Sequence, residues 1–579
     1  MTARDVRWFV PQLQLRPLGP RRGHVRNPMN GAALKLSSGE YAVLSSCEGC
    51  ETLPAHEERA AERLLAPPEH RAAIHELLEG CVRSGLLMAL PDLVARFGAP
   101  AAAGPQALAA VVVRTADRPQ LLARLLASAA ALEARFGSRR RWIVIDDSRD
   151  PVNERANRAA LEAHRALDVE HVDRAAAAVL EQTLRLEFPR LASEIAWVLG
   201  AGSPLEATYG VPVNHALLRL AGRTFVTVDD DVIIDARRPA ISEPGFSVSD
   251  EADALRWYES EEALWRDCPA LELDPVTAHE QWLGLAMAEA WAQAEAQAGA
   301  PVEIRVSAVD VARFAAGARV LFTHNHACGD PGSSLLPLQL LALPRRSRQW
   351  LASDPQAAAY GFTSRIDWRG QARLRLAPGR ILTFTTMTGI DNTRLLPPTA
   401  RSHRSEDVLL GIVAQHMYPS SWVVDLPFGL PHLRAPAKRW LGSRDAFAQE
   451  PLHVVYSQVD EHAPQIVSAS AEQRIAAIGA LLLDLAAASD RRLGETLLQH
   501  ATDAGSRTLF SIQEQLDDTT LPAQWKAALE PWLQSPALTA DEARARVLSP
   551  TAVRPLLEAY GRALIAWPLL WEFCQERNR

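Results

Sequence analysis

Three adjacent aspartates, Asp229, Asp230 and Asp231, follow the apolar run Thr224 to Val228. Adjacent carboxylates repel one another and raise one another's pKa values, so they require a cation or hydrogen-bond donors nearby. Because side chains alternate along an extended strand, we expect Asp229 and Asp231 to share one face while Asp230 points away. One of these two can bind Mg²⁺ or Mn²⁺, and the other can hold a ribose hydroxyl or a metal-bound water. A solvated acidic turn is the structural alternative.

A second acidic pair, Glu406 and Asp407, precedes the predicted helix Val408 to His416. Acidic residues favour the N-terminus of a helix, and Ser405 stands at or near the position that caps it. That structural interpretation accounts for one carboxylate. Two adjacent acids after an arginine-rich loop can instead supply a general base for an acceptor hydroxyl, with Arg404 tuning their charge.

Polar residues also follow two earlier apolar runs. Thr115, Asp117 and Arg118 lie between a predicted strand and a predicted helix, where backbone N–H groups and an arginine can bind a pyrophosphate. Asp146 and Asp147 end the next predicted strand, where a carboxylate can accept hydrogen bonds from a nucleobase or a ribose. A carboxylate that caps the following turn is the alternative for this second pair.

The elements that position these residues read as the start of a doubly wound α/β sheet. Short β-branched apolar runs suit buried parallel strands, and amphipathic segments between them suit helices. The predicted strands are Ala109 to Val113, Trp142 to Ile145 and Thr224 to Val228, and the predicted helices are Pro119 to Phe136 and Val213 to Leu220. Ligands collect at the carboxyl ends of the strands in such sheets, which is where the polar residues stand.

Residues 108–435 resemble the GT-A glycosyltransferases, especially those of family-2 type. The resemblance rests on a T-x-x-R strand end, a V-I-D-D-S strand, an Asn-containing helix before a D-x-D strand end, and an R-x-E-D motif before a helix. It implies a metal-dependent glycosyltransferase with a GT-A-type, doubly wound, mostly parallel sheet. The donor would be a nucleotide-sugar, with a UDP-sugar favoured, and the acceptor a peptide or a saccharide.

The residue patterns and the resemblance together predict the members of one site. The predicted nucleotide-sugar ligands are Thr115, Asp117, Arg118, Asp146, Asp147, Asn214, Asp229 and Asp230; the metal ligands are Asp231, Asp229 and His432; and the catalytic pair is Asp407, as the base of an inverting reaction, with Glu406. One departure concerns the helix before the D-x-D strand. Pro212-Val213-Asn214 stands where the family has Ala-Arg-Asn, so an arginine contact to the donor is missing there.

Residues 1–100 form a separate winged-helix-like α+β module in the sequence. Extended segments (Val6 to Leu15, Ala33 to Leu36) precede three predicted helices, Glu40 to Cys47, Ala55 to Leu65 and Glu69 to Ser84. The pattern resembles the PqqD-like recognition modules that accompany enzymes modifying ribosomal peptides, and it implies peptide binding. Packing against the rest of the chain, or DNA binding, are the alternatives for a winged helix.

The remaining chain divides by composition. A linker-like stretch, Gly98 to Pro105, precedes the predicted glycosyltransferase domain, 106–445, and 460–579 reads as a C-terminal helical domain. Within 106–445, the acidic segment 241–300 is predicted to be a helical insertion that covers the site. Further strands are predicted at Ala318 to Thr323 and Arg380 to Thr386. His324 to Ser334, with its Gly-Asp-Pro-Gly turn signal, is predicted to be an acceptor-side loop rather than a metal site.

Composition limits the other function classes. The formal net charge of −8 argues against a protein that grips nucleic-acid phosphates. No segment approaches the roughly 20 apolar residues that span a bilayer, and the first residues lack the apolar core of a signal peptide, so we expect a cytoplasmic protein. The six cysteines are scattered, and Cys47 and Cys50 lack a second ligand pair for zinc, so we expect reduced thiols.

Two other functions fit parts of the pattern. A winged helix joined to a degenerate nucleotide-sugar fold would be a noncatalytic binding or regulatory protein, although such a protein needs no base beside a metal site. A nucleotidyltransferase also combines an α/β sheet with carboxylates and Mg²⁺. It would more naturally carry a glycine-rich phosphate loop after the first strand, where this chain has Arg114-Thr115-Ala116-Asp117.

Overall fold

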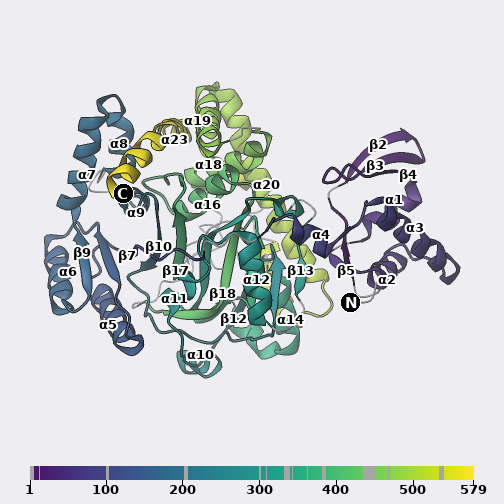
Figure 1. Cartoon of the computed structure of the whole chain (residues 1–579), viewed down its shortest axis with the longest axis horizontal. Helices are drawn as coiled ribbons and strands as arrows, with labels where there is room; N and C mark the ends of the chain where they lie inside the picture. The colour runs from purple at the N-terminus through teal and green to yellow at the C-terminus, as the bar shows by residue number, and fades with distance from the viewer. Residues whose placement is uncertain are drawn as a thin grey trace.

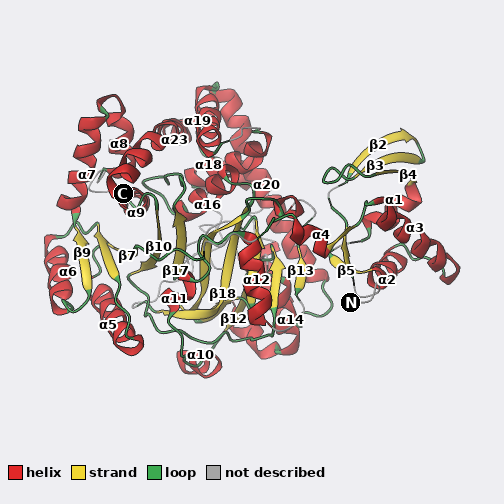
Figure 2. Cartoon of the chain, in the orientation of Figure 1, coloured by secondary structure: helices red, strands yellow, loops and turns green. Residues whose placement is uncertain are grey.

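The computed structural model is an α/β protein built on one large sheet with helices on both faces (Figures 1 and 2). It describes residues 6–11, 13–47, 49–99, 104–200, 207–298, 302–307, 310–330, 340–341, 343–361, 363–380, 386–434, 450–466, 470–533 and 540–579. Within the described residues the sheet has 12 strands, ten of which follow the order β13-β11-β16-β18-β14-β17-β10-β7-β8-β9.

The first half of this sheet is parallel and agrees with the sequence. Its strands are β7 (Ala110–Thr115), β8 (Arg141–Asp146), β9 (Asp168–Val172) and β10 (Arg223–Asp229), in the spatial order β9-β8-β7-β10. The helices between them are α5 (Pro119–Phe136), α6 (Pro151–Ala163), α7 (Arg174–Glu187), α8 (Ala192–Leu199) and α9 (Gly210–Arg219). The three predicted strands and both predicted helices of this region are confirmed, with α5 having the predicted bounds.

The second half makes the sheet mixed: among the described strands six pairings are parallel and five are antiparallel, so the sheet is parallel only by a narrow majority. Strand β17 (Met387–Asn392) runs antiparallel to both of its neighbours, β10 and β14. The other strands are β14 (Arg319–Gly329), β18 (Ser421–His432), β16 (Leu374–Pro378), β11 (Phe246–Ser249) and β13 (Glu303–Arg305), and β12 (Ala254–Trp257) and β15 (Asp367–Gly370) pair beside β14. All of β17 is buried, and a strand buried on both faces reads the same in the sequence whichever way it runs.

Two predictions for this half need correction. Segment 241–300 contains the helices α10 (Glu261–Asp267), α11 (Pro275–Glu280) and α12 (Met287–Ala298), but also β11 and β12, and its Phe246 and Trp291 belong to the central core. It is therefore part of the sheet rather than a helical insertion. Residues 324–329 extend β14 and are almost wholly buried, so they are not a loop; the rest of the predicted loop and most of the predicted strand Arg380 to Thr386 lie outside the described residues.

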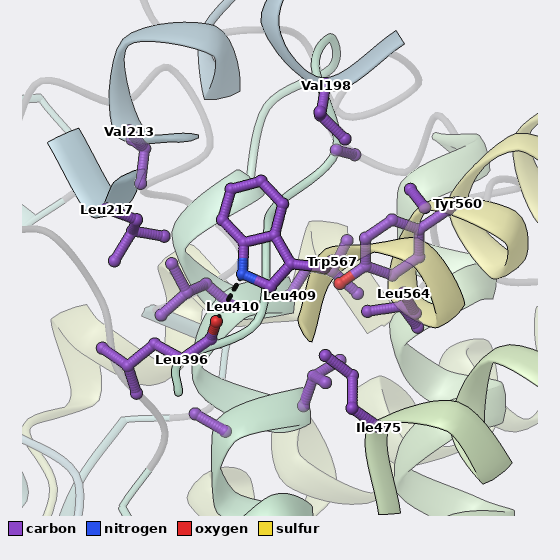
Figure 3. Packing of buried hydrophobic residues seen from close by; sticks show 14 of the residues in the cluster. Val198, Val213, Leu217, Leu396, Leu409, Leu410, Ile475, Tyr560, Leu564 and Trp567 are labelled. Atoms are coloured by element: carbon purple, nitrogen blue, oxygen red, sulfur yellow. Dashed lines mark hydrogen bonds between the residues drawn. The ribbon is translucent and has the colours of Figure 1, made fainter. Parts of the chain in front are cut away.

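The C-terminal helices pack directly on one face of the sheet. Helices α16 (Glu406–Met417), α18 (Pro451–His462), α19 (Ala471–Ala487) and α23 (Pro550–Asn578) share one hydrophobic cluster with β7, β8 and β10. Trp567 of α23 lies at its centre, fully buried, and its indole Nε1 donates to the backbone oxygen of Leu396 at 2.7 Å (Figure 3). Further helices described in this part of the chain are α14 (Arg345–Ser353), α15 (Ala358–Gly361), α20 (Asp490–Asp517), α21 (Ala523–Leu533) and α22 (Ala540–Ala545).

The N-terminal module has two small sheets and three main helices. An antiparallel sheet, β2 (Gln14–Gly19), β3 (Arg22–Arg26) and β4 (Ala33–Ser37), leads into α1 (Ser38–Ser45), α2 (Leu53–Arg63) and α3 (Arg71–Ser84). A second sheet, β1 (Arg7–Phe9), β5 (Cys50–Thr52) and β6 (Met88–Ala89), precedes α4 (Leu90–Ala95). The three predicted helices are confirmed within about two residues, and a reciprocal Ser37–Glu40 capping box starts α1.

The module is joined to the sheet through packed aromatic residues. Phe97 stacks on Phe314 with ring centroids 5.2 Å apart and meets Trp422 edge-on at 5.6 Å. Cys50 is buried in the same cluster as these rings, and burial raises the pKa of its thiol to about 12. None of the described helices is both long and apolar enough to cross a membrane.

Replacing Trp567 tests whether the C-terminal helices and the sheet unfold together. We expect Trp567→Ala to lower the free energy of unfolding by about 3–5 kcal/mol, because it leaves a cavity and removes the donor to Leu396. Urea denaturation followed by circular dichroism and fluorescence measures this loss. Phe510→Ala removes a ring that is 71% exposed on α20 and is the matched control, with an expected change of about 0.5 kcal/mol or less. If the C-terminal helices unfolded in a transition of their own, and Trp567→Ala shifted only that transition, the result would contradict a shared core.

Candidate active site

The three aspartates lie where the order of the sheet reverses direction. The chain passes from β7 outward to β8 and β9, whereas β10 pairs with the other side of β7. In open α/β sheets the carboxyl ends of two such strands border a crevice that binds ligands. Thr115 is the last residue of β7 and Asp229 is the last residue of β10.

The chain turns directly after Asp229, which changes the expected directions of the aspartates. Asp230 and Asp231 lie in a turn that the backbone N–H of Val232 closes on the Asp229 carbonyl at 3.2 Å. Strand alternation therefore does not apply, and the prediction that Asp229 and Asp231 share a face is wrong. Asp230 and Asp231 instead share one cation, because Nη1 of Arg118 lies 3.0 Å from Asp230 and 3.4 Å from Asp231.

Asp230 points back toward β7 rather than into solvent. Its side chain accepts a hydrogen bond from Oγ1 of Thr115 at 2.7 Å as well as the contact from Arg118. Only 2% of the residue is exposed, and burial raises the pKa of its carboxyl to about 6 against the opposing effect of Arg118. Thr115 and Arg118, both predicted to contact the donor, thus hold the aspartate turn.

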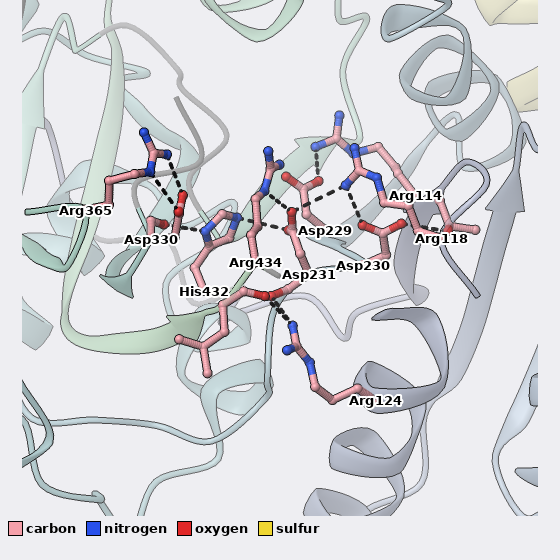
Figure 4. Close-up of polar contacts among 12 residues, drawn as sticks. Arg114, Arg118, Arg124, Asp229, Asp230, Asp231, Asp330, Arg365, His432 and Arg434 are labelled. Atoms are coloured by element: carbon pink, nitrogen blue, oxygen red, sulfur yellow. Dashed lines mark hydrogen bonds and ion pairs between the residues drawn. The ribbon is translucent and has the colours of Figure 1, made fainter. Parts of the chain in front are cut away.

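Asp231 is fully buried and is surrounded by basic groups (Figure 4). Nε2 of His432, the last residue of β18, lies 3.0 Å from Oδ1, and Nε of Arg434 donates to Oδ2 at 2.5 Å. Although burial opposes it, the charges of His432, Arg434 and Arg118 lower the pKa of Asp231 well below its usual range. The structure therefore brings together Asp231 and His432, which are far apart in the sequence.

His432 is oriented by a second group. Its Nδ1 lies 2.5 Å from the backbone oxygen of Asp330, whose carboxylate pairs with Arg365 through contacts of 3.1 and 3.0 Å. Despite the opposing effect of burial, the charge of Asp231 raises the pKa of His432. Nη2 of Arg124, a residue of α5, donates to the backbone oxygens of Asp231 and Leu433, at 2.8 and 2.7 Å. It therefore ties the turn after β10 and the residues after β18 to α5.

Arg114 joins the aspartates to the second acidic pair. This β7 side chain donates from Nη2 to Asp229, and its Nη1 lies 3.7 Å from Oε1 of Glu406, at the start of α16. Burial, and next the negative charge of Asp407, raise the pKa of Glu406 to about 7. The arginine thus brings the two acidic motifs into one site.

The residue before this pair is strained and does not act as the expected cap. Ser405 stands at the predicted N-cap position of α16, but it has φ of 73° and its side chain makes no cap hydrogen bond. His403 also has φ of 74°, and left-handed backbone at non-glycine residues costs free energy and concentrates at functional sites. The hydroxyl of Thr399 donates to the Glu406 carbonyl and holds the turn.

The other predicted nucleotide ligands divide between bracing and open positions. Asn214 is fully buried and bonds both backbone groups of Thr399, at 2.8 and 3.0 Å, together with the carbonyl of Val198. Asp146 accepts from Asn157 at 3.0 Å and contacts His171 at 3.2 Å. Both side chains therefore brace the loops around the site, and neither is free to reach a ligand.

The two remaining residues lie nearer the crevice. Asp117, with φ of 56°, accepts from the backbone N–H groups of Arg149 and Asp150 and ties the loops after β7 and β8 together. Asp147 pairs with the hydroxyl of Thr208, its side chain is 13% exposed, and burial raises its pKa. Asp147 is therefore the better placed of the β8 pair to accept from a ligand.

Three arginines of the site were not predicted. Arg114 and Arg434 pair with the carboxylates and Arg124 holds their backbone, yet each looks like an ordinary basic residue in an arginine-rich chain. The position of Arg114, directly before the T-x-x-R strand end, is a usable signal. For Arg434 the signal is its place two residues after His432.

The described residues contain no group of three or more His, Cys, Asp or Glu side chains arranged to hold a metal ion. Asp231 and His432 supply two neighbouring ligand atoms. Mg²⁺ and Mn²⁺ sites of the kind that bind substrate phosphates often use only one or two protein ligands, with phosphate oxygens and waters as the rest. Asp231 and His432 therefore fit a divalent ion if phosphate oxygens and waters supply its other ligands. Arg118 and Arg434 compete with such an ion for the carboxylate of Asp231.

Comparison with known proteins gives no match: no family model, no curated protein and no solved structure matches this chain.

Replacing Asp231 tests the charge balance of the site. We expect Asp231→Asn to lower the free energy of unfolding by about 3 kcal/mol, because it leaves buried cations uncompensated. Since the pKa of Asp231 is lowered, this difference is present above its ordinary value of 3.8 and shrinks as the pH falls through it. The same substitution should lower the pKa of His432, which NMR titration measures.

Asp229→Asn is the matched control, because the Asp229 side chain is 31% exposed and one arginine pairs with it. Its expected cost is about 1 kcal/mol or less. Equal stability of the Asp231→Asn variant and the wild type in urea denaturation at pH 7 would contradict the account of this carboxylate.

Proposed function

We propose that this chain is a GT-A-type glycosyltransferase that transfers a sugar from a nucleotide-sugar, with a UDP-sugar favoured, to a peptide or saccharide acceptor. The observation that carries the proposal is Arg114, which contacts Asp229 and Glu406 and so joins a D-x-D strand end to an acidic pair at a helix start. The crevice at the reversal of strand order supports the same function, because nucleotides bind at such points.

The basic groups suit the diphosphate of the donor. Arg118 has a side chain that is 41% exposed, so its remaining N–H groups can meet a phosphate while one contacts Asp230 and Asp231. Asp231 and His432 would hold a divalent ion, which neutralises the charge that grows on a departing diphosphate. Asp147 is the candidate acceptor of hydrogen bonds from the ribose or base.

The acidic pair supplies proton transfer in this proposal. Asp407 takes the proton of the acceptor hydroxyl as its oxygen attacks the anomeric carbon, and the bond from that carbon to the donor phosphate breaks. Attack from the opposite face gives the inversion that the resemblance implies. A pKa near 7 at Glu406 supports a base poised near neutral pH, and two coupled carboxyls of this kind titrate as a pair.

The two competing functions predict different outcomes. A noncatalytic binding protein would bind the donor without turning it over. The residues after β7 contain no glycine-rich phosphate loop, which disfavours a nucleotidyltransferase. The N-terminal module remains the proposed site for a peptide partner, on its resemblance to PqqD-like modules.

Turnover of the donor by variants of the acidic pair tests the proposal. We expect Asp407→Asn to slow release of the nucleotide from a UDP-, GDP- or dTDP-sugar roughly 10²–10⁴-fold, because the general base is lost while the donor contacts remain. The wild-type rate should rise with pH through about 7, as the pair loses its shared proton.

Glu406→Gln is the informative companion. The neutral amide removes the negative charge beside Asp407, so the base loses its proton more readily and the rise in rate moves to lower pH. Full activity of Asp407→Asn, or a pH profile that Glu406→Gln leaves in place, would argue against this pair as the acid–base centre.

A further inference from the structure

A cavity of about 1260 Å³ is lined by residues of helices α16, α18, α19 and α20. Figure 1 shows where these four helices lie in the chain. Its inner wall includes Val408 and Ile412 of α16, and Tyr456 and Gln458 of α18. Pockets for small molecules usually span about 300–1,000 Å³, so this cavity has room for a larger ligand.

The cavity adjoins the proposed base. Val408 follows Asp407 in the first turn of α16 and lines the cavity. Tyr456 of α18 also lines the cavity; burial, and then the negative charge of Asp407, raise its pKa to about 12, while Arg507, another lining residue, opposes the shift. The cavity therefore begins one residue after the carboxylate of Asp407 on α16.

The cavity is elongated along α20. Lining residues recur on one face of that helix at intervals of three or four, from Arg492 through Thr496, Gln499 and Asp503 to Arg507. At a rise of 1.5 Å per residue this face is about 22 Å long. An extended chain of about six or seven residues matches that length.

The rim of the cavity favours a cationic ligand. Four lining carboxylates, Asp460, Glu461, Asp484 and Asp503, face two lining arginines. In the described part of the chain, Glu461, Asp484 and Asp503 have no basic side chain within ion-pair distance. The described lining also contains His462 and His500, and burial lowers the pKa of His500. A ligand with ammonium or guanidinium groups would complement these carboxylates.

The lining suits a peptide better than a saccharide chain. Gln458 is 4% exposed and has no hydrogen-bond partner among the described residues, so its amide can both donate to and accept from a peptide backbone. Tyr456 supplies the one phenyl or indole ring among the described lining residues, which leaves few flat surfaces for sugar rings.

We infer that this cavity binds the acceptor of the transfer as an extended peptide segment with Lys or Arg beside the Ser or Thr that receives the sugar. The inference rests on the proposed function. The hydroxyl loses its proton to Asp407 while its oxygen bonds to the anomeric carbon, and the electron pair of the broken bond leaves with the nucleotide diphosphate.

Fluorescence anisotropy with labelled seven-residue peptides tests this inference. One probe has a central Ser flanked by lysines, a second has glutamates in their place, and an unlabelled glucosamine oligomer serves as competitor. We expect the lysine peptide to bind, and to bind roughly tenfold more weakly to the Glu461→Lys/Asp503→Lys variant, because attraction becomes repulsion. Glu495→Lys on α20 is the matched control, because Glu495 is exposed and lies outside the cavity lining, and it should leave binding unchanged.

Equal binding of the glutamate peptide, unchanged binding to the charge-reversed variant, or binding of the glucosamine oligomer in preference to both peptides would overturn the inference. Thermal melting of each variant establishes that it is folded. Binding of nucleotide-sugars is measured on the same samples. If the wild type binds the lysine peptide but no nucleotide-sugar, the result counts against the proposed function. If it binds a nucleotide-sugar but not the lysine peptide, the result counts against this cavity as the acceptor site.

Discussion

Neutralising buried carboxylates is the constraint on which the rest of this structure depends. Asp230 and Asp231 are buried at the end of β10, and each would cost several kcal/mol if it were left without a partner. Their partners come from distant segments. Arg118 follows β7, His432 is the last residue of β18, and Arg434 comes two residues after β18. Satisfying this one turn therefore fixes the relative positions of both halves of the sheet.

The same constraint reaches the acidic pair through β7. Arg114 and Thr115 are neighbours on one strand, and they contact Asp229 and Asp230 respectively. Arg114 also lies beside Glu406, so the first turn of α16 is held against the aspartates. The other side of α16 packs into the cluster that includes Trp567, which means that the C-terminal helices support the acidic pair from behind.

Local periodicity predicted the first half of the fold because each element there follows a simple rule. The strand Trp142 to Ile145 is a short buried run, and the helix Pro119 to Phe136 has an apolar stripe and a proline at its start. Strand β14 was mistaken for a strand followed by a loop, because His324 and His326 are polar residues buried in a sheet. Their burial depends on partners such as Asp425, 3.4 Å from His324, which a single segment cannot reveal.

The sequence singled out the acidic residues of the site together with Arg118 and His432, but it did not single out Arg114, Arg124 and Arg434. Adjacent aspartates are conspicuous because they repel, whereas Arg114 and Arg434 acquire meaning only from the carboxylates they meet in space. The predicted faces of Asp229 and Asp231 were wrong because the strand ends at Asp229, two residues before Asp231. Asn214 and Asp146 fit the sequence pattern of ligand contacts, yet their hydrogen bonds are used within the protein.

Isothermal titration of UDP-, GDP- and dTDP-sugars, with and without Mn²⁺, into the wild type and Arg118→Ala tests the central claim most directly. The account predicts that one nucleotide-sugar binds the wild type, more tightly with Mn²⁺, and binds a folded Arg118→Ala variant at least about tenfold more weakly, because a charge-assisted contact to phosphate is lost. No binding across the panel, or binding that Arg118→Ala leaves unchanged, would contradict a diphosphate site at the ends of β7 and β10.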